Sequence, residues 1–201
     1  MKKSIIFLWV FIILGCKQKY NENYCFSYYT KQTIYIQPYE DFTINETNKL
    51  LPDIKKYFDY WLYGNWNFKV LKPIPLPKNS KLSDYNKYEA IKILNYQNAR
   101  IKNNEIIIGL THKDICTDIH NIKHYGILGF SYSPGNVCII SDKRINNKSL
   151  IWKTILHEFI HAYYGAKHCP KDDSTCFMVD AKGKGNLAIQ NKLCNSCNCY
   201  K

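Results

Sequence analysis

The sequence is short of acidic residues and lacks the features of a nucleic-acid-binding protein. It has 16 Asp and Glu against 28 Lys and Arg, which gives its 201 residues a formal net charge of +12. The lysines are scattered in runs no longer than two, and no nucleic-acid-binding motif occurs. We therefore expect no nucleic-acid partner. We interpret the charge as a solvated surface that favours membrane proximity or acidic substrates.

The sequence also lacks an apolar run long enough to cross a membrane as a helix. The run at residues 5–14 has ten residues, about half the length that a bilayer requires. It follows a short basic start and ends in Leu-Gly-Cys at Cys16, which is typical of a secretory signal peptide with a bacterial lipobox. We expect residues 1–15 to be a signal peptide, Cys16 to be lipidated and residues 16–30 to be a polar tether. The protein would then be exported and lipid-anchored in a bacterial cell envelope; a buried N-terminal strand is the alternative.

The rest of the chain, residues 31–201, has the patterning of one globular domain. Hydrophobic residues make up 46% of the sequence and charged residues 22%, as in folded proteins. Apolar periodicity predicts helices at residues 46–63, after Asp84 and around residues 150–161. It predicts strands at residues 33–37, 68–71, 105–110, 125–132 and 136–141. This order predicts an α/β fold in which a mixed sheet packs against helices.

Three of these elements carry more specific expectations. Pro52 should lie in the first turn of its helix or break it. Asp84 can cap the helix that follows it. The strand at residues 105–110 is apolar almost throughout, so we expect it to be central in the sheet.

The most informative stretch is His157-Glu158-Phe159-Ile160-His161. Residues four apart on a helix share a face, so both imidazoles can close on one metal ion. Glu158 falls beside them, where it can contact a water on that ion. This is the arrangement of two zinc ligands and a general base in metallopeptidases. A helix that happens to carry two histidines is the alternative.

A zinc site of this kind needs a third protein ligand and leaves a fourth position open. No glutamate follows the motif, which excludes a late glutamate as that ligand. The candidates that remain are His168, Asp172, Asp173 and Asp180. Gly165 offers a place for the helix to end and for the chain to turn back.

Residues 157–169 resemble the archaemetzincin motif, H-E-x-x-H-x-x-G-x-x-H followed by Cys. That family continues with a second Cys, then x-Met, and then a C-x-x-C pair. This chain has Cys176, Met178, Cys194 and Cys197 in the same order. Upstream, three further segments are similar to the family and extend the resemblance to about residues 33–197: residues 82–94, 106–115 and 125–141.

The chain departs from the family pattern in its spacing. Three residues, rather than two, separate His161 from Gly165, and six, rather than four, separate Cys169 from Cys176. The loop before the C-x-x-C pair is slightly shorter. One extra helical residue rotates the exit of the helix by about 100°. We expect either a π-bulge or one more residue in the last turn to absorb it.

The resemblance implies a zincin fold of the metzincin type. This is a twisted mixed β-sheet packed against helices, with an active-site helix and a small Cys-rich C-terminal subdomain. It also implies a catalytic zinc held by His157, His161 and His168. Peptide bonds would be hydrolysed by a zinc-activated water with Glu158 as the general base, and Met178 would lie in a turn beneath the zinc ligands.

Four cysteines form two close pairs, Cys169 with Cys176 and Cys194 with Cys197. Four thiolates suit a closed structural zinc site, and the family is understood to carry a second zinc. Two disulfides are the alternative in an oxidising compartment. Besides Cys16, four cysteines remain: Cys25, Cys116, Cys138 and Cys199. A disulfide between Cys116 and Cys138 is one option.

Two functional classes fit these patterns. The first is a lipid-anchored zinc metallopeptidase that contains two zinc ions and acts on a peptide or protein substrate. The second is a zinc-stabilised binding lipoprotein without catalytic activity. Glu158 favours the enzyme, because an inactive site has no use for that base.

Overall fold

A computed structural model of the protein describes residues 31–102, 105–119, 121–181 and 186–198. The expected signal peptide, the lipidated Cys16 and the tether lie outside these residues, as do Cys25 and Cys199. Within the described part, no helix is both long and apolar enough to cross a membrane.

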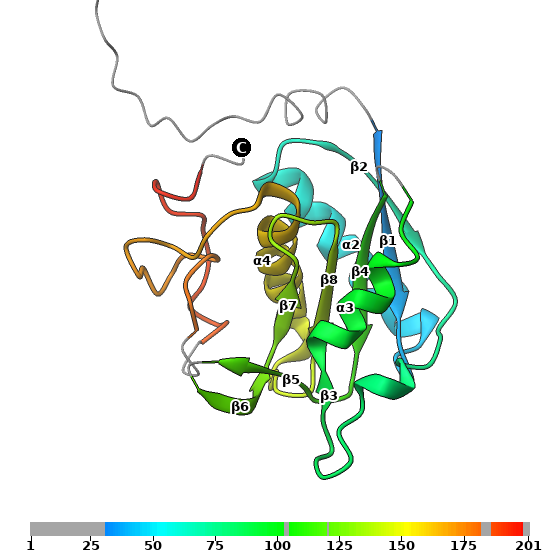
Figure 1. The fold of residues 1–201 in the computed structure, drawn as a ribbon. Helices are drawn as coiled ribbons and strands as arrows, with labels where there is room; N and C mark the ends of the chain where they lie inside the picture. The colour runs from blue at the N-terminus through cyan, green and yellow to red at the C-terminus, as the bar shows by residue number, and fades with distance from the viewer. Residues whose placement is uncertain (1–30, 103–104, 120, 182–185, 199–201) are drawn as a thin grey trace, which may run out of the picture.

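A five-stranded sheet forms the centre of the fold (Figure 1). Its strands in chain order are β1 (Lys31–Pro38), β2 (Asn65–Val70), β4 (Glu105–Thr111), β7 (Gly129–Ser131) and β8 (Val137–Ser141). In space the order is β2-β1-β4-β8-β7, with four parallel strands and β7 antiparallel to β8. A smaller sheet, ordered β3-β5-β6, joins β3 (Tyr88–Glu89), β5 (Ile115–Ile119) and β6 (Ile122–Ile127).

Among the described residues, three α-helices cover the two faces of the large sheet (Figure 1). They are α2 (Ile44–Trp61), α3 (Ala90–Asn98) and α4 (Ile151–Tyr164), and 3₁₀ turns span Lys78–Ser80 and Lys148–Leu150. Helices α2 and α4 share one hydrophobic cluster with one face of the sheet, and α3 shares a second cluster with the other face. The fold is therefore the expected mixed α/β sheet packed against helices.

Strand β4 shows why the central strand is apolar throughout. Successive side chains of a strand point to opposite faces of the sheet. Ile106 and Ile108 accordingly enter the α2/α4 cluster, and Ile107 enters the α3 cluster. Neighbours pair with β4 on both edges, so the prediction of a central strand is confirmed.

Helix α2 holds α4 in place through aromatic contacts. Its first turn is fixed by a capping box, in which Thr43 and Glu46 bond each other's backbone N–H groups. Further along, the rings of Phe58 and Phe159 lie 4.6 Å apart. Such buried aromatic pairs add about 1 kcal/mol to the burial of their area. Helix α4 is therefore anchored in the core.

Two expectations about helices were wrong. Pro52 lies well inside α2, which runs unbroken past it. Proline has no N–H, so the carbonyl of Asn48, four residues earlier, receives no helical hydrogen bond. Pro52 and Asn48 are both exposed, so water can bond that carbonyl instead. Asp84 does not cap α3, which begins at Ala90 with Glu89 at its N-cap and no side-chain cap.

The expected strand at residues 125–132 is two strands. It divides at Leu128 into β6, which belongs to the small sheet, and β7, which belongs to the large one. Strand β5, which pairs with β6, was missed. Cys116 and Cys138 are buried free thiols, so the disulfide considered between them does not form.

In its described residues, the segment after α4 contains no further α-helix and no strand of either sheet. It runs alongside α4 (Figure 1) and buries apolar side chains in the α2/α4 cluster. The side chains of this Cys-rich segment that enter the cluster are Ala166, Cys169, Cys176, Phe177, Met178, Leu193, Cys194 and Cys197. The expected Cys-rich C-terminal part is therefore present, and it packs on the main core.

Candidate metal centre and cleft

Helix α4 is buried on nearly all sides, which fixes the direction of its polar groups. Its own apolar side chains pack into the core, and two of them, Ile155 and Phe159, are fully buried. The helix ends at Gly165, whose backbone is left-handed with φ 63°. Glycine adopts this conformation without strain, and here the chain turns back along the helix.

Three histidines meet at this turn. The Nε2 atoms of His157 and His161 lie 3.0 Å apart, close to the roughly 3.3 Å expected for two ligands of a tetrahedral zinc ion. One ring nitrogen from each of His157, His161 and His168 lies within 4.8 Å of the others. The three side chains therefore fit one zinc ion without moving far.

The backbone orients two of the imidazoles. His157 Nδ1 lies 2.7 Å from the carbonyl oxygen of Phe177, and His161 Nδ1 lies 2.6 Å from that of Ala166. A carbonyl only accepts, so each Nδ1 carries the proton and each Nε2 is free to bind a metal. Burial lowers the pKa of His157 and His161 to about 4, which keeps both imidazoles neutral as metal binding requires.

The third histidine is held less tightly. His168 is exposed, and its Nδ1 lies 3.9 Å from Asp180 Oδ2. Of the aspartates that the sequence offered as ligands, Asp180 lines the same cleft as the histidines, whereas Asp172 and Asp173 do not. None of the three aspartates belongs to the group of side chains that converges with His157 and His161.

The extra residue before Gly165 lies in the last turn of α4. The helix is regular up to Tyr164, and the Gly165 N–H bonds the carbonyl of His161 at 3.0 Å, four residues back. The Gly135 N–H bonds the Ala162 carbonyl at 2.8 Å. The helix is therefore one residue longer than the family motif implies, has no π-bulge, and still delivers His168 to the other two histidines.

Glu158 is held by strand β7. Its side chain is buried, and its Oε2 accepts a hydrogen bond of 2.8 Å from the Ser131 hydroxyl. Gly129, two residues before Ser131 on the same face, packs so closely that a Cβ there would lie 2.5 Å from Glu158 Cγ. Burial raises the pKa of Glu158. Sequence reasoning did not identify either β7 residue as a contact of Glu158, because the two segments are distant in the chain.

A cleft of about 1000 Å³ contains these groups. Strands β6 and β7 border it on one side, and His157, Glu158, His161 and His168 all line it. Strand β6 pairs only with β5 among the described strands, so its other edge is open to pairing. The cleft can therefore admit an extended chain beside the histidines.

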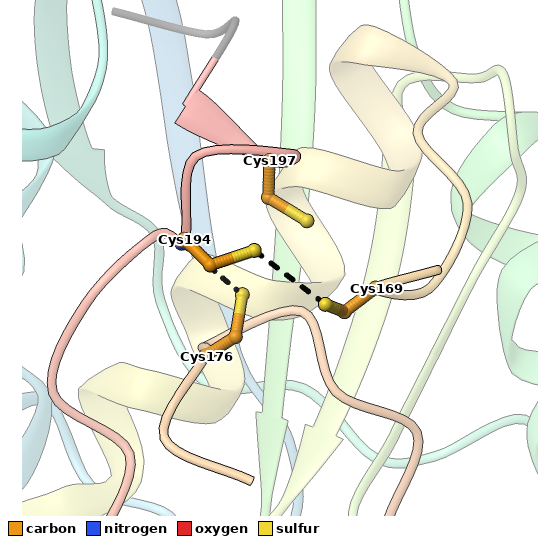
Figure 2. A group of neighbouring side chains, drawn as sticks. All are labelled: Cys169, Cys176, Cys194 and Cys197. Atoms are coloured by element: carbon orange, nitrogen blue, oxygen red, sulfur yellow. Dashed lines mark hydrogen bonds between the residues drawn. The ribbon is translucent and has the colours of Figure 1, made fainter. Parts of the chain in front are cut away.

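The four cysteines form a second potential metal site, shown in Figure 2. All four are buried and free, and their Sγ atoms lie within 4.8 Å of one another. Cys169 Sγ lies 3.6 Å from Cys194 Sγ, near the roughly 3.8 Å expected between thiolates on a tetrahedral zinc ion and far from a disulfide bond. Burial raises the pKa of Cys176 to about 11, so a metal would be needed to deprotonate it at neutral pH.

The two sites share one segment of chain. His168 directly precedes Cys169, and Phe177, whose carbonyl orients His157, directly follows Cys176. The Cys169 N–H bonds the Met178 carbonyl at 2.7 Å, and Met178 is fully buried. Met178 thus lies in a turn that packs into the core directly beside the residue that orients His157.

Two solved structures share this architecture. The crystal structure of archaemetzincin from Methanopyrus kandleri matches with a TM-score of 0.67 at 19% sequence identity, over 83% of this chain and 92% of that chain. Archaemetzincin from Archaeoglobus fulgidus, complexed with malonate, matches with a TM-score of 0.63 at 21% identity, over 82% and 97%. No protein-family model and no curated protein matches the sequence. The structure shows that this chain has the archaemetzincin fold.

Proposed function

We propose that the protein is a zinc-dependent peptidase that hydrolyses peptide bonds with Glu158 as general base. The observation that carries this proposal is the convergence of three imidazoles beside a buried carboxylate within one cleft. Three neutral ligands and an open fourth position are the arrangement of a catalytic zinc rather than a structural one. The archaemetzincin fold supports the same conclusion.

The residues of the chain divide the chemistry among them. A zinc ion on His157, His161 and His168 would lower the pKa of a bound water to about 7 and polarise a carbonyl. Glu158 takes a proton from the attacking water and returns it to the leaving amine. The Ser131 hydroxyl holds Glu158 Oε2, so one carboxylate oxygen is fixed and the other stays available for proton transfer.

The substrate we propose is an extended peptide or protein segment. An extended chain beside β6 gains main-chain hydrogen bonds from the open strand edge. It then passes over the histidines, which line the same cleft.

An inactive zinc-stabilised binding protein would also keep the two metal sites, but it gives no reason for Glu158. A carboxylate at this position is buried at a cost in free energy, and the one hydrogen bond described for its side chain comes from Ser131. General-base catalysis explains both its burial and its raised pKa.

The proposal is tested with a peptide library and mass-spectrometric detection of cleavage. The zinc-loaded protein should cleave a subset of peptides, and a chelator should stop cleavage. Glu158→Gln should retain its metal and lose several orders of magnitude in rate, since the residue is a base and not a ligand. Cleavage by Glu158→Gln at the wild-type rate would show that another group is the base.

We also propose a second, structural zinc in the cysteine cluster. The four buried thiols at zinc-compatible spacing support it. Metal analysis of protein purified without chelator should give about two equivalents of zinc. One equivalent, with the four cysteines recovered as disulfides, would rule out the structural ion.

Finally, we propose that Cys16 carries a lipid that anchors the exported protein to the cell envelope. The sequence of residues 1–16 supports this proposal. Cys16→Ser should abolish incorporation of a labelled fatty acid and release the protein from the membrane fraction. Equal labelling of the variant would refute lipidation at this cysteine.

A further inference from the structure

Lys153 is a buried cation in the wall of the same cleft. It lies on α4, one helical turn before His157, and its residue is only 7% exposed. Its Nζ donates to the carbonyl oxygens of Leu187, at 2.6 Å, and Gln190. Lys153, Leu187 and Gln190 all line the cleft that contains the histidines.

Within the described chain, the charge of Lys153 is faced by the Trp152 ring, whose centroid lies 5.6 Å from Nζ, and by no carboxylate. No carboxylate of the described residues lies within 4.0 Å of its Nζ, and the two groups that it bonds are neutral carbonyls. Burial lowers its pKa, and no neighbouring carboxylate counteracts that effect. A neutral donor could make the same two bonds without the cost of burying a charge.

The residue next to Lys153 carries a polar group with no hydrogen-bond partner among the described residues. This group, the hydroxyl of Thr154, is buried, and Thr154 lines the same cleft. The other cations that line the cleft differ. Arg144 donates from Nε and Nη2 to the two carboxylate oxygens of Asp114 at 2.7 Å, Lys87 donates to the His124 carbonyl, and Lys123 is exposed. Lys153 is therefore the buried cation of the cleft that pairs with no anion in the described chain.

We propose that Lys153 binds a carboxylate of the substrate, so that the preferred substrates are peptides with a carboxylate close to the cleaved bond. This inference rests on the proposed peptidase function and names the substrate class. Four helical residues span about 6 Å, so the carboxylate lies within about two residues of the bond that reacts at the histidines. It is either an Asp or Glu side chain or the free C-terminal carboxylate of a short peptide.

The first experiment compares matched peptides on the zinc-loaded full-length protein. One set exchanges Glu for Gln at each position around the cleavage site, and another set exchanges a free C-terminus for an amide. We expect kcat/KM to be at least about tenfold higher for the carboxylate member of one set, in line with the strength of charge-assisted hydrogen bonds. The set that shows the preference identifies which carboxylate is bound. Equal cleavage within every pair would overturn the inference and leave the peptidase function standing.

The second experiment replaces the lysine. Lys153→Gln keeps a donor for the carbonyls and removes the charge, so kcat/KM for the carboxylate peptides should fall toward that of their neutral partners and the preference should be lost. A purely structural lysine would instead lower both members of each pair equally. Lys123→Gln removes the same charge from an exposed lysine of the cleft and should retain the preference. An unchanged preference in Lys153→Gln would overturn the inference. If that variant does not fold, the wild-type comparison still decides.

Binding provides a readout that does not need hydrolysis. On zinc-loaded Glu158→Gln protein, the carboxylate peptides should bind about tenfold more tightly than their neutral partners. If wild type cleaves nothing and this difference persists, the peptidase function fails and the carboxylate site stands. Equal binding of both members would overturn the site.

Discussion

Gly129→Ala places a single methyl group against the proposed general base. An ideal Cβ at this position would lie 2.5 Å from Glu158 Cγ, 2.8 Å from Oε1 and 2.9 Å from Cδ. Carbon atoms in contact prefer about 3.5 Å, so either the Glu158 side chain or strand β7 must move by about 1 Å. The backbone at Gly129 is ordinary strand, so the methyl group itself causes no backbone strain.

A displacement of this size should reduce activity far more than stability. Misplacing a reacting group by about 1 Å can cost about 10²-fold in rate. The added methyl group should destabilise the fold by about 1–3 kcal/mol, as overpacking does. Glu158 is not a proposed ligand, so the zinc content should not change.

The assay compares kcat/KM, thermal unfolding and zinc content of Gly129→Ala with wild type. Gly135→Ala is the control, because its Cβ would lie 2.6 Å from Tyr132 Cβ in the turn between β7 and β8, away from Glu158. We expect the control to lose stability and to keep kcat/KM within a few-fold of wild type. Wild-type kcat/KM in folded, zinc-loaded Gly129→Ala would refute the role given to the position of Glu158.

Two further predictions concern the histidines. His168→Ala should lose the zinc of the histidine site and keep the cysteine-bound ion. The control variants Asp172→Ala, Asp173→Ala and Asp180→Ala should lose little zinc. Unchanged zinc content and activity in His168→Ala would transfer the ligand role to an aspartate. Metal-free protein should unfold at a lower temperature at pH 5 than at pH 7, because burial lowers the pKa of both helix histidines from 6.5 to about 4. The unfolded chain binds protons in that interval that the folded chain does not, so stability is lost as the pH falls. The raised pKa of Glu158 favours the folded state as the pH falls, which is the opposite effect, so both unfolding temperatures are measured on the Glu158→Gln variant. An equal or higher unfolding temperature at pH 5 would contradict the prediction.

The parts of the site that the sequence could predict are those fixed by local geometry. His157 and His161 share a helix face because they are four residues apart, and no tertiary contact is needed to bring them together. His168 follows from Gly165, which turns the chain back within three residues. The same reasoning predicted β4 as the central strand, since its apolar pattern leaves no face for water.

The parts that the sequence could not predict depend on contacts between distant segments. Ser131 reaches Glu158 from 27 residues away, and Lys153 reaches Gln190 from 37 residues away. Nothing near Ser131 or Lys153 in the sequence indicates either contact. The division of residues 125–132 at Leu128 has the same origin, because the pairing of β6 with β5 and of β7 with β8 decides it.

The two proposed metal sites should depend on each other in one direction only. Cys169 and Cys176 are the covalent neighbours of His168 and Phe177, so a metal on the cysteines also fixes the third histidine and the carbonyl that orients His157. In the other direction, His157 and His161 sit on a helix that the core already holds, and the cysteine cluster needs neither of them. Cys194→Ser should therefore lose the cysteine-bound zinc and also weaken zinc binding at the histidines by about 10–100-fold, the usual cost of losing the groups that orient a ligand. Zinc retention during dialysis against increasing chelator measures both sites. An unchanged affinity at the histidine site in Cys194→Ser would show that the fold positions His168 and Phe177 without help from the second metal.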